Sequence, residues 1–244
     1  MPRVIAPGDR ADVVIDPRFN GPPDSGHGGY SAGRAAALVD AAPGGAVEVT
    51  LRRPVPLATP LAVSARGDGA VELSAGGELV MAARPVPAPA PGPDPVVGLA
   101  AARAAADPAG WADGHPFPTC FGCGPERDPA DALCLYAGDA GDGRYAVPWV
   151  PAAWAGDEGV VAPELVWAAL DCPSSAPALS AFPVVLGRLT VALGGAPVRV
   201  GAEYVVETWL EAAEGRKHHT AVALHDGAGT VHARGRATWI ALTA

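Results

Sequence analysis

A proline stands at every second position from Pro85 to Pro95 and divides the chain into two parts. Proline fixes its φ angle and lacks a backbone N–H, so this segment (PVPAPAPGPDP) should form neither a helix nor an inner strand. Closely spaced prolines favour an extended, semi-rigid connection. We therefore expect a linker here, and the 244 residues are enough for two domains of modest size.

The part before the linker predicts one helix followed by short strands. The Ala-rich segment 30–42 (YSAGRAAALVDAA) favours a helix that stops at the Pro-Gly-Gly of residues 43–45. Hydrophobic and polar residues then alternate at 47–51 and 61–65, which is typical of strands. Segments 71–73 and 79–81 complete a run of antiparallel strands.

The part after the linker predicts the same order of elements. A short linker helix at 96–106 is followed by a second domain that starts near His115, with strands in 132–148 and a helix at 163–172 that Pro173 ends. Four strand-like runs follow, at 184–193, 198–210, 217–225 and 230–242. In the second run, even-numbered residues are mostly hydrophobic and Arg199, Glu203 and Glu207 face the other way, which predicts a half-buried antiparallel strand. Since both halves give one helix and then a meander, we infer an internal duplication.

Composition and charge exclude several functions. The chain is 49% hydrophobic and 18% charged, which is typical of a folded protein with a sizeable core. Its net charge is −9, and no long run of basic residues supports nucleic-acid binding. The N-terminal MPRVIAPGDRADVVID resembles no signal peptide, and no segment has the length of hydrophobic residues that a membrane helix needs. Four cysteines in this length suit a reducing cytoplasm better than a disulfide framework.

Two motifs resemble a known family. His27-Gly-Gly-Tyr30 at the start of the first helix resembles the HGG turn of the PaaI-like thioesterases, which belong to the hotdog superfamily. The segment 115–125 (HPFPTCFGCGP) resembles an entry motif of hotdog domains in that superfamily. The resemblance implies an α+β fold: a tandem double hotdog in which each half wraps a curved antiparallel sheet around a central helix. The expected boundaries are 1–85 for the N-terminal hotdog, 86–114 for the linker and 115–244 for the C-terminal hotdog.

In the resembling family an acidic residue follows the HGG histidine by nine positions. That position is Ala36 in the first half, so the acid is absent there. Aligning residues 162–164 with the HGG turn puts Asp171 at the position in the second half. Hence the first half has the turn without the acid, and the second half has the acid without the turn.

Helix geometry indicates how the two halves complement each other. Eight residues separate Gly28 from Ala36, and Pro163 from Asp171, which is about 12 Å along a helix. One helix therefore cannot bring both groups to one carbonyl. Hotdog pairs set their central helices antiparallel, which would let Gly28 meet Asp171. The twin site would combine Ala36 with Pro163, which has no N–H to donate.

This arrangement implies catalytic roles for four residues. The N–H groups of Gly28 and Gly29 would stabilise an oxyanion at a helix N-terminus. Asp171 would act as the general base for water or as the nucleophile. His27 would orient the turn. Two structural alternatives stay open: the glycines only form a tight turn, or Asp171 only binds the loop amides of residues 173–175.

Further residues are candidates for substrate contacts. Asn20 would position water or the thioester, although an Asn before Gly21 is also a common turn residue. Tyr30 follows the glycines of the turn. Arg188 and Arg234, with Lys217 and Arg236, are candidates for the phosphates of CoA or, alternatively, solvated surface charges.

The cysteines raise the question of a metal. Cys120-x-x-Cys123 with Cys134, Cys172 and His115 could suggest zinc, but a second CxxC pair is absent and the spacing is irregular. We therefore expect reduced structural thiols, no metal and no cofactor.

A different motif predicts a different enzyme. Gly29-Tyr-Ser31-Ala-Gly33 matches the nucleophile elbow of α/β-hydrolases. That elbow needs a preceding strand, and segment 19–26 (FNGPPDSG) is a poor strand, so we expect these small residues to allow close helix packing instead.

The sequence therefore predicts a cytoplasmic thioesterase that hydrolyses an acyl-CoA or related thioester, and a homodimer of double hotdogs is the predicted assembly. One alternative is a hotdog enoyl-CoA hydratase or dehydratase, for which Asp24 and His27 are weak candidates. The other is a catalytically silent protein that binds acyl ligands or serves as a scaffold.

Overall fold

The computed structural model describes residues 12–181 and 183–242. Residues 1–11 lie outside the described residues. They include the start of the predicted first domain and most of the N-terminal segment that we compared with a signal peptide. No described helix has the length and hydrophobicity to cross a membrane.

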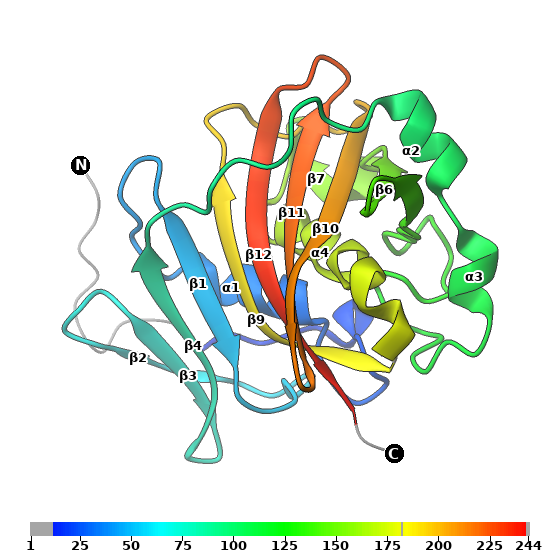
Figure 1. Ribbon diagram of the computed structural model, residues 1–244. Helices are drawn as coiled ribbons and strands as arrows, with labels where there is room; N and C mark the ends of the chain where they lie inside the picture. The colour runs from blue at the N-terminus through cyan, green and yellow to red at the C-terminus, as the bar shows by residue number, and fades with distance from the viewer. Residues whose placement is uncertain (1–11, 182, 243–244) are drawn as a thin grey trace.

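A single antiparallel sheet of ten strands dominates the fold (Figure 1). Its strands lie in the order β2-β3-β4-β1-β9-β12-β11-β10-β6-β5. Their bounds are β1 (Ala46–Leu51), β2 (Ala62–Ala65), β3 (Val71–Ala75), β4 (Glu78–Val86), β5 (Gly138–Gly141), β6 (Arg144–Trp149), β9 (Val184–Leu193), β10 (Tyr204–Glu214), β11 (Lys217–Asp226) and β12 (Val231–Ala241). Two further short strands, β7 (Gly156–Asp157) and β8 (Val160–Val161), pair with each other.

The helices are short. The α-helices are α1 (Gly28–Ala36), α2 (Leu99–Ala105), α3 (Pro108–Ala112) and α4 (Pro163–Asp171), and the 3₁₀ helices are η1 (Pro17–Phe19), η2 (Ala153–Ala155) and η3 (Cys172–Ala181). The protein is thus of the α+β class, with a large antiparallel sheet and few helices.

The two halves of the sequence meet in the middle of the sheet. Strand β1 of the first half pairs with β9 of the second half, from Val47 opposite Val191 to Thr50 opposite Arg188. The first half supplies the four strands on one side of this junction and the second half supplies the six on the other. The backbone hydrogen bonds of both halves therefore form one continuous ladder.

Helices α1 and α4 pack on the same face of the sheet, behind it in Figure 1. The main core fills the space between them and the strands, with fully buried side chains such as Leu73, Met81, Leu170 and Leu224. Helix α2 covers the opposite face near β6 and β10, where Val97 and Ala102 pack against Val205.

Three predicted helix and strand ends are wrong. Helix α1 starts earlier than residue 30, because His27 caps it, and ends at Ala36, where i→i−3 hydrogen bonds tighten the chain. The predicted bounds of α4 are confirmed to within one residue, since it ends at Asp171, and a 3₁₀ helix, η3, follows it directly. Strand β4 runs into the proline-rich segment as far as Val86, because Pro85 lies beyond the part of β4 that pairs with β3.

Strand β10 also differs from the prediction. It begins at Tyr204 rather than at residue 198, and residues 204–208 are buried on both faces. On its outer face, Val97 and Ala102 of the linker pack against Val205, and the N–H of Val97 donates to Glu207. The expected alternation fails because a sequence pattern does not reveal that the linker packs on this face. In segment 132–148 the named strands begin only at Gly138.

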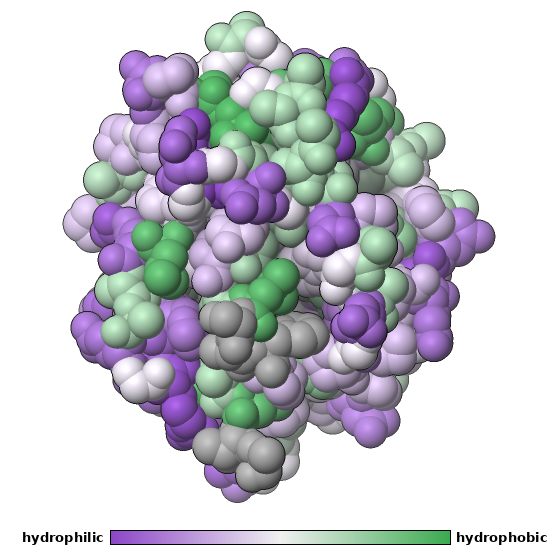
Figure 2. Space-filling model, turned by 45° about the vertical axis from the view of Figure 1, so that its right-hand side comes forward, coloured by the Kyte–Doolittle hydropathy of each residue, from purple (hydrophilic) through white to green (hydrophobic). Residues whose placement is uncertain are grey.

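Exposed hydrophobic side chains are dispersed. On the face shown in Figure 2, hydrophobic residues form small groups separated by hydrophilic ones. The large exposed ones among the described residues are Val14, Val150, Leu193, Leu210, Val231 and Leu242. Scattered hydrophobic residues of this kind are normal for a protein surface, and the homodimer stays a prediction.

Candidate active site

Helix α1 begins at a turn that a histidine caps. The Nδ1 atom of His27 lies 3.2 Å from the backbone nitrogen of Tyr30 and accepts its hydrogen bond. The N–H of His27 donates to the carbonyl of Phe19, which fixes the entry to the helix. The N–H of Gly28 donates to no residue that the structure describes. This group is therefore available at the positive end of the helix dipole.

Asp171 reaches this turn from the other half of the chain. It is the last residue of α4, and its Oδ2 atom accepts a hydrogen bond from the N–H of Gly29 at 2.6 Å. The same oxygen lies 3.4 Å from Nδ1 of His27. The other oxygen, Oδ1, is buried and has no hydrogen-bond partner among the described residues. The N–H of Gly29 is therefore not free, contrary to our expectation, and holds the carboxylate in place.

Serine hydroxyls satisfy the end of α4. Ser174 donates to the carbonyl of Asp171 at 2.6 Å, and Ser175 donates to the carbonyl of Cys172 at 2.8 Å. The hydrogen bonds that the structure gives the Asp171 carboxylate come from α1 and not from the amides of residues 173–175. Hence the structural alternative for Asp171 does not describe its environment.

Glycines allow the two helices to approach closely. A Cβ atom on Gly29 would lie 2.6 Å from the carbonyl oxygen of Trp167, and one on Gly33 would lie 2.6 Å from Cα of Glu164. Contacts that run from Gly29 towards residue 171 and from Gly33 towards residue 164 make α1 and α4 antiparallel. The interpretation of Ser31 and its small neighbours as packing residues is confirmed at Gly33.

Burial sets the charge state of the acid. It raises the pKa of Asp171 to about 6, while His27 and the Gly29 N–H act in the opposite direction. Burial acts to lower the pKa of His27, but the Asp171 carboxylate and the Cys120 thiol outweigh it, so the pKa of His27 is raised. A carboxyl group with a pKa of about 6 is mostly ionised at neutral pH and still able to accept a proton.

Three buried cysteines surround the other side of His27. Its Nε2 atom lies 3.2 Å from Sγ of Cys172, and the sulfur atoms of Cys172 and Cys120 are 3.8 Å apart. Sγ of Cys123 lies 3.3 Å from Nε2 of His115. Hydrogen bonds with Cys123 and Cys172 hold the pKa of Cys120 well below its usual range, and the pKa values of these two partners are raised by hydrogen bonding to Cys120.

A cavity of about 600 Å³ lies over these groups. His27, Gly28, Asp171 and the cysteines 120, 123 and 172 form its polar part. Its hydrophobic lining includes Leu51, Val55, Trp111, Val184, Leu186, Trp239, Ile240 and Leu242. A mostly hydrophobic cavity with a few convergent polar groups is typical of a small-molecule site.

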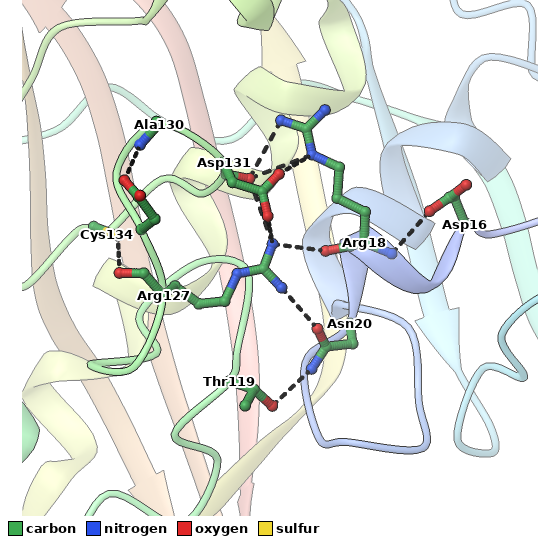
Figure 3. Close-up of polar contacts among 9 residues, drawn as sticks. Asp16, Arg18, Asn20, Thr119, Arg127, Ala130, Asp131 and Cys134 are labelled. Atoms are coloured by element: carbon green, nitrogen blue, oxygen red, sulfur yellow. Dashed lines mark hydrogen bonds and ion pairs between the residues drawn. The ribbon is translucent and has the colours of Figure 1, made fainter.

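Asn20 and Tyr30 lie outside the lining of this cavity, contrary to our expectation. The amide of Asn20 is buried, accepts from Arg127 at 3.2 Å and donates to Thr119 at 3.3 Å (Figure 3). Asn20 thus connects the loop before α1 to residues 115–134, which carry three cysteines and which we call the Cys-rich loop. The ring of Tyr30 stacks on Phe19 with ring centroids 3.8 Å apart.

The predicted basic residues do not line the cavity either. Arg188 lies near Thr50 and Glu48 on the sheet surface, and neither it nor Arg234 lines the cavity. Lys217 and Arg236 are likewise absent from its lining. Arg52 and Arg53 occupy the rim instead, directly after β1. Sequence reasoning missed them, although a pair of arginines at the end of a strand was a visible signal.

Two alternative catalytic groups are not assembled. Ser31 is fully buried within α1, and its hydroxyl has no partner among the described residues, so it lacks the base that a serine hydrolase needs. Asp24 is exposed at the cavity, and the acid that contacts His27 is Asp171.

The structure thus combines a large antiparallel sheet, two antiparallel helices on one of its faces and a buried acid beside a helix N-terminus. Searches with family models and against curated proteins find no match to the chain. Solved structures do resemble it over nearly the full length. A candidate thioesterase II from Thermobifida fusca superposes with a TM-score of 0.59 and 15% identity, over 95% of this chain and 93% of that one.

Two further structures agree. The TesB protein of Mycobacterium avium subspecies paratuberculosis gives a TM-score of 0.56 and 15% identity over 89% of this chain and 88% of its own. A candidate thioesterase from Novosphingobium aromaticivorans gives 0.56 and 13% identity over 97% of both chains. The predicted resemblance to the hotdog thioesterase superfamily is therefore confirmed for the fold.

Proposed function

We propose that the chain is a double hotdog that hydrolyses an acyl-CoA or related acyl thioester at one site between its halves. The first hotdog ends with β4, the linker carries α2 and α3, and the second begins at His115. The described part of residues 1–85 contains α1 with β1–β3 and all but the last residue of β4, and residues 115–242 contain α4 with the remaining strands. This division supports an internal duplication.

One contact carries the proposal: the hydrogen bond from Gly29 N–H to Asp171 Oδ2. It joins the turn of one half to the acid of the other, which is the complementarity that the sequence predicts. A carboxylate with one unpartnered oxygen, buried beside a cavity, lowers the stability of the protein. Such a group therefore needs a functional purpose to account for it. Catalysis supplies that purpose.

In the proposed reaction, the thioester carbonyl oxygen faces the N–H of Gly28, which stabilises the negative charge that develops there. Asp171 accepts a proton from a water molecule through Oδ1, and the water oxygen forms the new bond to the carbonyl carbon. The tetrahedral intermediate then breaks its C–S bond. The proton passes from Asp171 to the leaving thiolate, so the products are a carboxylic acid and a thiol.

The opposite pairing lacks both groups. Ala36 at the end of α1 has no carboxylate, and Pro163 at the start of α4 has no N–H. We therefore propose one active site per chain.

The cavity supports an acyl substrate with a phosphate-bearing carrier. Its hydrophobic wall suits an acyl chain, and the exposed Arg52 and Arg53 at the rim suit the phosphates of CoA. Free thiols at all four cysteines are compatible with the cytoplasmic location that we propose.

Hydration of an enoyl thioester is the second candidate, because His27 and Asp171 are in contact. Both ring nitrogens of His27 already have partners, Tyr30 N–H on one side and Cys172 on the other. A histidine held in this way is poorly placed to move a proton, so hydrolysis is the better-supported reaction.

Thiol release from a panel of short, long and aromatic acyl-CoAs tests the proposal. We expect turnover by the wild type and a loss of at least about 100-fold in kcat for Asp171→Asn. Glu164→Gln is the matched control, because Glu164 is a carboxylate on the same helix outside the cavity. Folded wild type that binds acyl-CoA without turnover would support the silent binding protein instead, and formation of a 3-hydroxyacyl product from an enoyl-CoA would support the hydratase.

A further inference from the structure

His27, Cys120 and Cys172 form a compact buried group, which we call the Cys–His cluster. One potential ligand atom from each lies within 4.8 Å of the others. The three residues come from separate segments: the turn before α1, the Cys-rich loop and the end of α4. The proposed hydrolysis uses none of the sulfur atoms. Packing alone offers no reason for a cysteine pair to converge on an imidazole nitrogen.

We propose that the Cys–His cluster binds a zinc ion, with Nε2 of His27 and the sulfurs of Cys120 and Cys172 as ligands. Thiolate and imidazole are the ligands that Zn²⁺ prefers in proteins. Sequence reasoning set zinc aside because a second CxxC pair is absent and the spacing is irregular. The histidine that it considered was His115, whereas the nitrogen near the two sulfurs belongs to His27.

The distances suit tetrahedral coordination. With Zn–S bonds of about 2.3 Å and Zn–N bonds of about 2.0–2.1 Å, a tetrahedral ion sets two sulfurs about 3.8 Å apart and a sulfur and a nitrogen about 3.5 Å apart. The sulfurs of Cys120 and Cys172 are 3.8 Å apart, and Nε2 of His27 lies 3.2 Å from the sulfur of Cys172. The third pair, Nε2 of His27 and the sulfur of Cys120, lies within 4.8 Å, and side-chain movement would bring it to the tetrahedral value.

His27 is also oriented as a metal ligand is. Metal-binding histidines commonly donate the N–H of their second nitrogen to a carboxylate. Nδ1 of His27 lies 3.4 Å from Oδ2 of Asp171. Zinc on Nε2 would place the imidazole proton on Nδ1, from which it can be donated to Asp171. Nδ1 would then no longer accept the hydrogen bond that it accepts from the N–H of Tyr30.

The fourth coordination position is open. All three ligands line the cavity, so this position is accessible to water or to a polar group of a bound molecule. Three protein ligands and one exchangeable position are typical of reactive zinc sites rather than purely structural ones. The inference concerns binding of the ion and does not depend on thioester hydrolysis.

Metal binding is measured directly, without turnover. The full chain is purified under reducing conditions, stripped with a chelator and titrated with Co²⁺ and with Zn²⁺. We expect one ion per chain by elemental analysis, and a thiolate-to-cobalt charge-transfer band with the visible absorption of tetrahedral cobalt.

Serine variants identify the ligands. Cys120→Ser and Cys172→Ser should each lower the affinity at least about tenfold. Cys134→Ser is the matched control, because Cys134 lies outside the cluster and its thiol donates to the carbonyl of Arg127 at 3.8 Å. Its affinity should equal that of the wild type.

Alkylation of the wild type gives a readout that needs no variant. Bound zinc should slow the modification of Cys120 and Cys172, located by mass spectrometry, and leave that of Cys134 unchanged. The proposal is overturned if no stoichiometric ion binds, if both serine variants bind as the wild type does, or if zinc does not alter the alkylation pattern.

Discussion

The carboxylate of Asp171 lies 2.6 Å from the backbone nitrogen of Gly29, although 142 residues separate them in the chain. The contact depends on the crossing of α1 and α4, and that crossing depends on glycine. A substitution at the crossing should therefore alter the free energy of unfolding. Substitutions elsewhere should distinguish residues that contact the substrate from residues that only stabilise the fold.

Gly33→Ala should destabilise the protein by about 1–3 kcal/mol, because the added Cβ would lie 2.6 Å from Cα of Glu164, and backbone cannot move aside cheaply. Helix propensity alone favours alanine by about 1 kcal/mol, so the sign of the change separates the two effects. Urea unfolding measures it. The control is Gly67→Ala, whose Cβ would meet no atom within 4 Å. A stabilised Gly33→Ala would contradict the close crossing.

Arg52→Ala should raise KM for an acyl-CoA about 5- to 10-fold, because the exposed guanidinium at the cavity rim would lose its contact with phosphate. KM for the same acyl group on a pantetheine carrier without the nucleotide phosphates should not change. Steady-state kinetics with both carriers test this. Arg188→Ala should leave both values unchanged, since Arg188 lies outside the cavity lining. Equal effects of the two substitutions would refute a phosphate contact specific to the rim.

Asn20→Ala should lower the free energy of unfolding by about 1–3 kcal/mol, because it leaves Arg127 and Thr119 without their buried amide partner. KM should stay within about twofold of the wild-type value, since Asn20 does not line the cavity. Denaturation and kinetics on one preparation check both statements. A raised KM with unchanged stability would restore the substrate contact that the sequence suggested.

Glu207→Gln should destabilise the protein by about 1–3 kcal/mol near pH 7. Glu207 is buried and interacts with Arg144 at 3.0 Å and with the N–H of Val97 at 2.9 Å. Burial acts to raise its pKa, but hydrogen bonds from His225 and Val97 and the charge of Arg144 outweigh it, so the pKa lies below the ordinary value of 4.5.

A lowered pKa in the folded state fixes the sign of the pH dependence. The ionised group stabilises the protein above the unfolded-state pKa, and this stabilisation is lost as the pH falls through the folded-state pKa. The difference between Glu207→Gln and the wild type should thus shrink below about pH 4. Urea unfolding at several pH values measures it, with Glu214→Gln, an exposed residue of the same strand, as the control. A difference that is constant with pH would rule out the ionised pair as its source.

Local features of the sequence determined much of this protein. The composition of 30–42 and 163–172 predicts the two central helices, and hydrophobic alternation predicts most strands. The spacing from His27 to Ala36 and from Ala162 to Asp171 indicates which half carries the turn and which the acid. The predictions of helices and strands succeed because helix rise and strand alternation are short-range properties of the backbone.

The tertiary structure alone decided the surroundings of those residues. No spacing rule brings Cys120 and Cys172 to His27, because the three segments meet only when α4 crosses α1. Arg52 lines the cavity and Arg188 does not, because the position of a side chain on its strand decides whether it reaches the cavity. A positive charge in the sequence does not reveal that position. Glu207 is buried at a place where Val97 of the linker contacts its strand. Each of these outcomes depends on packing between segments far apart in the chain, which local patterns do not encode.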